Sequence, residues 1–223
     1  MDLFEILDVF LIIAMGVLAI AAAILHSRDQ EKSGTAWSQA AQETGLDFLD
    51  RGAEDQELRG HHRGFRTRIR VRTETERRGR YNELVYYTII EIDARQEAIR
   101  AAMVRPRKYE EVPPVLRKEQ GQSFAATFLL HTDSLSGRLF QDDEIRAEFL
   151  EILNTGDTIQ LQAGRLKRVR QELFTDASRL VLFLDSATDL MDRLDIKARQ
   201  LQPPALGDPH VQEHTEEASN LIW

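Results

Sequence analysis

The hydrophobic pattern of the chain begins with one long apolar run, residues 9–25, which reads VFLIIAMGVLAIAAAIL. Apolar positions from Leu3 onward extend this run, at the cost of including Glu5 and Asp8. A helix of about 20 apolar residues is long enough to cross the hydrocarbon layer of a membrane. A cleaved signal peptide would carry a basic segment before its apolar run, whereas this segment is acidic. The pattern therefore predicts a retained transmembrane anchor over residues 1–27.

The charges beside the apolar run favour one orientation of the predicted anchor. Basic residues flank the run only on its C-terminal side, at Arg28 and Lys32. Because cytoplasmic flanks are enriched in Lys and Arg, we expect a single pass through the inner membrane of a bacterium, with the following domain in the cytoplasm. Ala19 and Ala23 form a small-residue face through which the helix can build a homo-oligomer.

The pattern after the anchor predicts a short polar linker at residues 28–34 and then a soluble domain over residues 35–199. From Phe65 to Thr73 apolar side chains or threonines alternate strictly with arginines, which is typical of a strand with one buried face. The next segment, residues 83–94, is dense in β-branched and aromatic side chains. We expect these two segments to pair as an antiparallel hairpin.

The second half of the domain has its own order of predicted elements. Residues 95–122 contain three prolines among many charges and predict an irregular connector. The elements that follow are a strand at 123–131, a helix at 142–153, strands at 158–162 and 166–170, and a helix at 175–196. The last helix carries a continuous apolar stripe that must pack on another surface. The grouping predicts an α+β fold with two layers, an antiparallel sheet covered by helices.

The C-terminal segment, residues 200–223, predicts a disordered acidic tail, because it contains three prolines, four acids and no Lys or Arg. Its last residues, Leu221, Ile222 and Trp223, are apolar and form a candidate docking motif. The alternative is that they pack back on their own domain.

Composition narrows the classes of function. The absence of cysteine excludes disulfides, thiolate metal sites and cysteine nucleophiles. The net charge of −8 disfavours a protein that covers nucleic acid with its whole surface. The sequence lacks the common phosphate-binding, dinucleotide-binding, zinc-protease and serine-hydrolase motifs. We therefore expect a non-enzymatic protein with no cofactor.

Two smaller groups of titratable residues favour structural roles. His61 and His62 are neighbours in a segment that reads as extended, so their side chains should point in opposite directions and not share a metal ion. Asp185, Asp189 and Asp192 share one stripe of the last helix. Acids opposite an apolar stripe usually form the solvated side of a helix.

The one local departure from the average charge is basic. From Arg59 to Arg80 there are nine arginines against Glu74 and Glu76, a balance of +7 in a chain of −8. Four of them alternate along one strand and should share a face: Arg66, Arg68, Arg70 and Arg72. Guanidinium groups suit phosphate and carboxylate oxygens, so this face is a candidate contact for anionic lipid headgroups or a protein partner. Nucleic acid is less favoured, because no aromatic residues interleave with the arginines.

The alternative for these arginines is internal pairing on an exposed sheet face. Their partners would be Glu91 and Asp93 on the next strand, the acidic stretch at 47–57, or the tail. Such pairs contribute little stability but occupy the charge. The sequence leaves both interpretations open.

The second half of the chain contains, in order, the segments FAATFLLHTD, LFQDDEIRAEFLEIL and DTIQLQAGRLKRVRQ, followed by the amphipathic last helix. In this order they resemble a family of uncharacterised bacterial membrane-anchored proteins. The helix at 37–45, the Leu58-x-Gly60 piece and the hairpin from Phe65 resemble its front half. The similarity lies in hydrophobic positions, so it implies a fold and no reaction. We expect a binding or scaffold domain at the membrane surface, or alternatively a structural subunit of an envelope complex assembled through the transmembrane helix and the C-terminal end.

Overall fold

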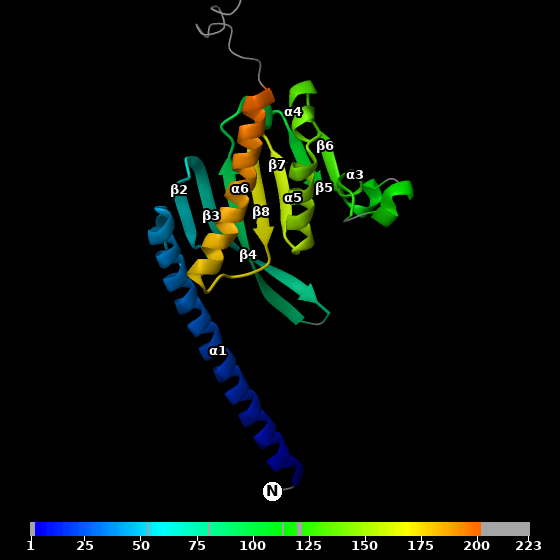
Figure 1. Ribbon diagram of the computed structural model, residues 1–223. Coiled ribbons are helices and arrows are strands. Elements are labelled where there is room, and N and C mark those ends of the chain that lie inside the picture. The colour runs from blue at the N-terminus through cyan, green and yellow to red at the C-terminus, as the bar shows by residue number, and fades with distance from the viewer. Residues whose placement is uncertain (1–2, 53, 80, 113, 120–121, 202–223) are drawn as a thin grey trace, which may run out of the picture.

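A computed structural model describes residues 3–52, 54–79, 81–112, 114–119 and 122–201 of the chain (Figure 1). The described strands form one antiparallel sheet of eight, in the order β1-β2-β3-β4-β8-β7-β5-β6. The strands are β1 (Asp47–Leu49), β2 (Glu57–His62), β3 (Phe65–Arg78), β4 (Tyr81–Asp93), β5 (Met103–Pro106), β6 (Phe128–His131), β7 (Thr158–Gln162) and β8 (Arg165–Arg170). The helices are α1 (Leu3–Thr44), α2 (Glu97–Arg100), α3 (Phe124–Thr127), α4 (Ser134–Leu139), α5 (Asp143–Asn154) and α6 (Ala177–Leu201), with 3-10 turns η1 (Tyr109–Glu111) and η2 (Pro114–Glu119).

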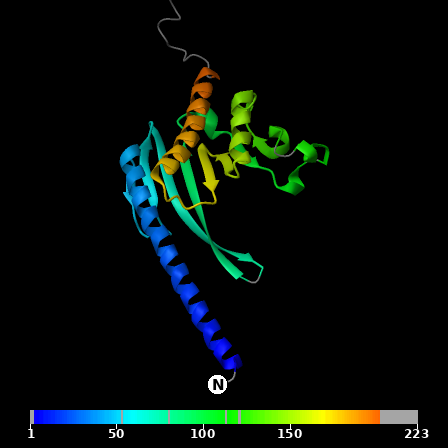
Figure 2. The ribbon, with the colours of Figure 1, turned by 60° about the horizontal axis from the view of Figure 1, so that its bottom comes forward.

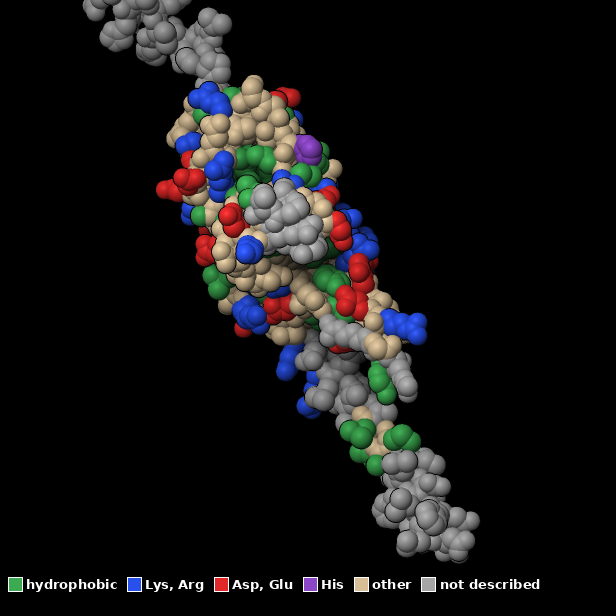
Figure 3. All heavy atoms as spheres, turned by 90° about the vertical axis from the view of Figure 1, so that its right-hand side faces the viewer, with side chains coloured by type: hydrophobic (Ala, Val, Ile, Leu, Met, Phe, Trp, Pro, Cys, Tyr) green, Lys and Arg blue, Asp and Glu red, His purple; other side chains and the backbone are tan. Residues whose placement is uncertain are grey.

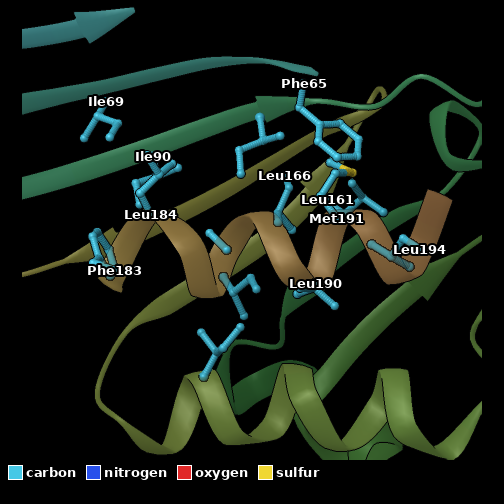
Figure 4. Packing of buried hydrophobic residues seen from close by; sticks show 14 of the residues in the cluster. Phe65, Ile69, Ile90, Leu161, Leu166, Phe183, Leu184, Leu190, Met191 and Leu194 are labelled. Atoms are coloured by element: carbon cyan, nitrogen blue, oxygen red, sulfur yellow. The ribbon is translucent and has the colours of Figure 1, made fainter. Parts of the chain in front are cut away.

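The main core lies between the sheet and helix α6. Apolar side chains of β3 and β4, among them Phe65, Ile69 and Ile90, point at Leu184 and Met191 of α6, and all five are almost fully buried (Figure 4). Burial of apolar surface is the main favourable contribution to folding. The apolar stripe of the last helix thus packs on the sheet, and the predicted α+β class, a sheet covered by helices, is confirmed.

The hairpin of β3 and β4 forms as the alternation predicts. The two strands pair over twelve positions from Thr67 opposite Ile92 to Arg78 opposite Tyr81. Figures 1 and 2 show that the hairpin extends beyond the rest of the sheet where β3 ends and β4 begins, on the side from which the N-terminal part of α1 projects. The hairpin therefore has a packed half near α6 and a protruding half.

The structure corrects the prediction of a transmembrane anchor over residues 1–27. Residues 3–27 belong to α1, one helix of 42 residues that continues without a break to Thr44. No helix in the part of the chain that the structure describes is both long enough and apolar enough to cross a membrane. The prediction was wrong because it treated the apolar run as a unit of its own, whereas the run is part of a longer helix that continues through charged residues onto the domain.

The linker predicted at residues 28–34 is also helical. Ser33 is fully buried, and its hydroxyl donates a hydrogen bond of 2.7 Å to Oε1 of Gln56. The Thr35 hydroxyl donates a hydrogen bond of 3.1 Å to the carbonyl of Glu31 within the same helix. Trp37, one turn further on, is fully buried. The polar sequence of residues 28–34 does not by itself indicate whether the helix ends or continues there. Buried contacts with the domain, such as those of Ser33 and Trp37, stabilise the continuous helix.

The second half of the domain differs from the prediction in its short elements. The connector at 95–122 contributes β5, which extends the sheet between β7 and β6. The segment predicted as one strand at 123–131 begins as helix α3 and becomes a strand only at Phe128. Helix α4, with Asp133 as its N-cap, lies between the predicted strand at 123–131 and the predicted helix at 142–153, where no element was predicted. These elements are four to six residues long, too short to show a clear period.

Candidate functional site

The face of the sheet opposite α6 carries the predicted arginines. Side chains alternate between the two faces of a strand, so that Phe65 and Ile69 enter the core while Arg66 and Arg68 point outward. All four predicted residues, Arg66, Arg68, Arg70 and Arg72, lie on this outer face. Arg66, Arg68 and Arg72 are exposed, and Arg70 is half-buried.

The register of the sheet sets polar side chains of six strands in a row across the outer face. In strand order from β1 to β7 the row is Asp47, Arg59, Arg68, Glu91, Lys167 and Gln160. Side chains directly opposite on neighbouring strands interact across about 5 Å. The row therefore places two arginines side by side, then a carboxylate between two cations.

Arg68 resolves the like-charge contact with Arg59 by turning to a diagonal neighbour. Its Nε and Nη2 donate hydrogen bonds of 2.9 and 2.8 Å to Oε1 and Oε2 of Glu57. The hydrogen bond from Arg68 lowers the pKa of Glu57 below its usual value, against the opposing effect of burial. The same hydrogen bond raises the pKa of Arg68. The pair is thus fixed in its ionised form near neutral pH.

The other predicted arginines also have carboxylate neighbours. Arg70 Nη2 lies 3.5 Å from Glu91 Oε1, and Arg72 Nε lies 3.0 Å from Glu74 Oε1. Asp93 lies between Arg66, at 4.0 Å, and Arg165, at 2.7 Å. The hydrogen bond to Asp93 raises the pKa of Arg165. Arg66 and Arg70 thus make the contacts with Asp93 and Glu91 that internal pairing, the alternative drawn from the sequence, requires.

A hollow of about 540 Å³ lies at the centre of this face. Its lining is Asp47, Glu57, Arg59, Gly60, His61, Arg66, Thr67, Arg68, Glu91, Asp93 and Arg165. Arginines and acids are equal in number in this lining, so the strongly basic local balance of the sequence is cancelled where the strands meet. The hollow is a polar, ion-paired surface, which we call the outer-face hollow.

Among the described cations of the outer face, Arg59 on β2 and Lys167 on β8 have carboxylates opposite them, Asp47 and Glu91, but form no ion pair with them. Arg59 is exposed and Lys167 is half-buried, and neither side chain makes an ion pair or hydrogen bond with another residue that the structure describes. They lie on opposite sides of the ion-paired centre, separated by β3 and β4. Three strand spacings of about 4.8 Å put their strands roughly 14 Å apart. These two positions are where the face retains attraction for an anion.

His61 and His62 point to opposite faces of the sheet, because they are adjacent residues of one strand. His61 lines the outer-face hollow, whereas His62 Nε2 lies 2.9 Å from Asp185 Oδ1 on α6. Arg63 Nη1 donates a hydrogen bond of 2.5 Å to Asp189 Oδ1 one turn further along α6. Asp185 and Asp189 of α6 thus bind the turn between β2 and β3. They are not only part of the solvated side of the helix. Within the described ranges no group of His, Asp and Glu could hold a metal ion.

Three cations of the outer face were not among the site residues predicted from sequence: Arg59, Arg165 and Lys167. Lys167 lies in the strand predicted at 166–170, and the observed strand begins one residue earlier, at Arg165. The missing information was that β8 pairs with β4, far away in the sequence. Leu221, Ile222 and Trp223, the candidate docking motif, lie outside the described residues.

Comparison of the chain with protein-family models, with curated proteins and with solved structures found no match. The residues of the site are therefore the basis for a functional assignment.

Proposed function

We propose that this chain is a non-enzymatic binding domain whose outer-face hollow receives an acidic segment of a partner protein. The observation that carries this proposal is that Arg59 and Lys167, on either side of an ion-paired centre, make no ion pair with another residue that the structure describes. An extended segment rises about 3.3 Å per residue, so two acids four residues apart would span roughly 13 Å. That span matches the separation of the β2 and β8 strands across the hollow.

The paired acids of the face favour a polypeptide over an anionic membrane surface. Glu57 lines the hollow beside Arg59, and Glu91 and Asp93 line it on β4, between the strands of the two cations; a sheet of lipid phosphates would lie against these carboxylates as well. A polypeptide carries charges of both signs and backbone hydrogen-bond donors. Its side chains can therefore match the alternating cations and acids of the outer face one by one. The alternation of charges on this face would therefore both attract an acidic segment and fix its position along the face.

The chemistry of the hollow also supports binding over catalysis. A general acid or base works best when its pKa lies near the operating pH. The Arg68 hydrogen bond shifts the pKa of Glu57 in the opposite direction, below the usual value for Glu. Its carboxylate is therefore suited to holding a guanidinium in place and not to exchanging protons near neutral pH.

The proposal is tested by photo-crosslinking in cells that produce the full chain. A photoreactive amino acid replaces His61 inside the hollow, and the control position is Leu182, an exposed residue of α6 on the other side of the sheet. We expect a discrete protein adduct from position 61 and none from position 182. Adducts that form equally from both positions would contradict the proposal.

Charge reversal sharpens this test. The double variant Arg59→Glu/Lys167→Glu should abolish the adduct, because it removes both unmatched cations. The matched control is Arg138→Glu/Lys118→Glu, which makes the same change in net charge at exposed positions of α4 and η2. An adduct that survives the first reversal would overturn the proposal. Loss of sedimentation with phosphatidylglycerol vesicles in the first variant, with no adduct in the parent chain, would assign the face to lipid instead.

A further inference from the structure

A second hollow, of about 470 Å³, lies between α3, β6 and α5 and is distinct from the outer-face hollow. Its lining is Arg107, Ser123, Phe124, Ala125, Phe128, Leu130, Asp143, Arg146, Ala147 and Leu150. Figure 3 views this side of the domain, where hydrophobic side chains gather in a depression with charged groups around it. We call this site the aromatic groove.

The floor of the aromatic groove is a cluster of phenylalanines. The rings of Phe124 and Phe128 stack with centroids 5.0 Å apart, and Phe149 meets Phe128 edge-on at 5.7 Å. Phe128 and Phe149 are fully buried, whereas Phe124 and Leu150 are only partly buried. The fully buried rings form a rigid base, and the partly buried side chains leave apolar surface facing the groove.

Two arginines at the groove are held in position by backbone carbonyls. Arg107 Nε donates to the carbonyls of Ala125 and Phe128, 3.1 and 3.0 Å away. Arg146 donates to the carbonyl of Phe140, and its Nη1 lies 3.6 Å from Asp143, a carboxylate that is almost fully exposed. The exposed pair of Arg146 with Asp143 contributes little, and Arg107 makes no ion pair with another described residue, so both guanidinium groups keep attraction for a further carboxylate. The groove therefore suits an apolar ligand with acidic groups beside it.

We infer that the aromatic groove binds residues 216–223 of the same chain, EEASNLIW. The apolar residues Leu221, Ile222 and Trp223 match the phenylalanine floor, and Glu216 and Glu217 match the two arginines. Residues 202–223 contain acids and no Lys or Arg, so nothing in this segment opposes the approach. Helix α6 ends at Leu201, and 20 residues can span up to about 65 Å, which exceeds the dimensions of a domain of this size.

Tryptophan fluorescence tests this inference in the full chain, which has Trp37 and Trp223 as its two tryptophans. Trp37 is fully buried, so it is protected from the quencher acrylamide, and quenching reports on Trp223. A Trp223→Phe variant isolates the signal of Trp37. With the segment in the groove we expect a blue-shifted Trp223 emission and weak quenching. Emission and quenching equal to those of a free tryptophan peptide would overturn the inference.

Two variants release the segment if it is bound. Ala147→Glu places a carboxylate at an exposed groove position of α5 and retains good helix propensity, so the domain should fold. Leu221→Ser/Ile222→Ser removes the apolar contacts from the segment itself. Each should raise the quenching constant of Trp223 several-fold, whereas the control Ser178→Glu, which adds the same charge at an exposed position of α6, should not. Quenching that is unchanged in both variants, or protection that depends on protein concentration and so arises from a second copy, would overturn the inference.

Discussion

Arg68 and Glu57 are diagonal neighbours on β3 and β2, and the guanidinium donates two hydrogen bonds, of 2.9 and 2.8 Å, to the two carboxylate oxygens. The residue directly opposite Arg68 on β2 is another arginine, Arg59. The diagonal pair thus relieves a like-charge contact and leaves Arg59 without an ion pair to any described residue. The stability of the sheet and the availability of Arg59, which we propose as a binding cation, depend on the same carboxylate.

Replacing Glu57 by Gln should destabilise the domain in a pH-dependent way. We expect the free energy of unfolding at pH 7 to fall by about 1–3 kcal/mol, because a charge-assisted two-point pair is lost. The folded pKa of Glu57 lies below its unfolded value, so its contribution is present above the usual pKa of 4.5 and is lost as pH falls through the folded value. Urea unfolding from pH 7 down to pH 3 should show the difference between parent and variant shrinking. The control Asp55→Asn, at an exposed ion pair, should cost under about 1 kcal/mol at each pH.

The charge cluster around Asp157 should be among the most sensitive polar sites of the domain. Asp157 is buried and pairs with buried Arg168 at 2.6 Å and with Arg170 at 2.7 Å. Asp157→Asn leaves the Arg168 guanidinium without its counter-charge in a site where burial already lowers the pKa of that arginine. We expect a loss of about 3–5 kcal/mol in the free energy of unfolding, measured by urea denaturation.

Asp143→Asn is the control for this cluster, because Asp143 is an exposed acid that lies 3.6 Å from Arg146. It should change the free energy of unfolding by less than about 1 kcal/mol. Equal losses for Asp157→Asn and Asp143→Asn would show that the buried cluster contributes no more than a surface pair.

Glu148 should oppose stability at neutral pH, in contrast to Glu57. Burial raises the pKa of Glu148, while Arg193, 3.5 Å away, compensates only in part. A raised folded pKa gives a contribution that is present below the unfolded pKa and is lost as pH rises through the folded value. Glu148→Gln should therefore leave stability unchanged near pH 4 and raise it by up to about 1 kcal/mol at pH 8. A variant that is less stable than the parent at pH 8 would show that the Arg193 pair outweighs burial.

The turn between β7 and β8 should tolerate only glycine at position 164. Gly164 has a φ of +72°, and an added Cβ would lie 2.5 Å from Cγ and 3.3 Å from Cα of Arg100. Gly164→Ala should cost about 2–4 kcal/mol in thermal or urea unfolding, from strain and clash together. Gly156 has a φ of +88° but open space around it, so Gly156→Ala should cost only the strain, about 1 kcal/mol. Similar losses at the two positions would exclude the contact with Arg100 as a cause.

The arginine face was predictable because alternation is a local property of a strand. Phe65 to Thr73 shows which side chains share a face whatever lies beside the strand. The partners of that face were predictable only where they are near in sequence, as for Glu91 and Asp93 on the next strand. Arg165 joins Asp93 from 72 residues away, and a strand's neighbours depend on the packing of the whole sheet.

The helix boundaries also fall into two groups, those that local sequence predicts and those that depend on tertiary contacts. Asp142 accepts hydrogen bonds from the amides of Glu144 and Ile145, and α5 starts beside it as its sequence predicts. By contrast, α1 continues through residues 28–34, where the predicted linker lies, and buried Ser33 and Trp37 hold it against the domain. Caps act within one turn of a helix, whereas the continuity of α1 depends on contacts with Gln56 and the core.

The sequence by itself determined the periodicities of this protein: an α+β class, a strand with arginines on one face, and a last helix with an apolar stripe. These follow from bond geometry over a few residues. Only the tertiary structure decided that the basic segment contributes to a hollow with equal numbers of arginines and acids, in which Arg59 makes no ion pair with a described residue, and that the apolar run belongs to one long helix. Charge balance at a surface and the extent of a helix depend on groups brought together from distant parts of the chain, which no local pattern records.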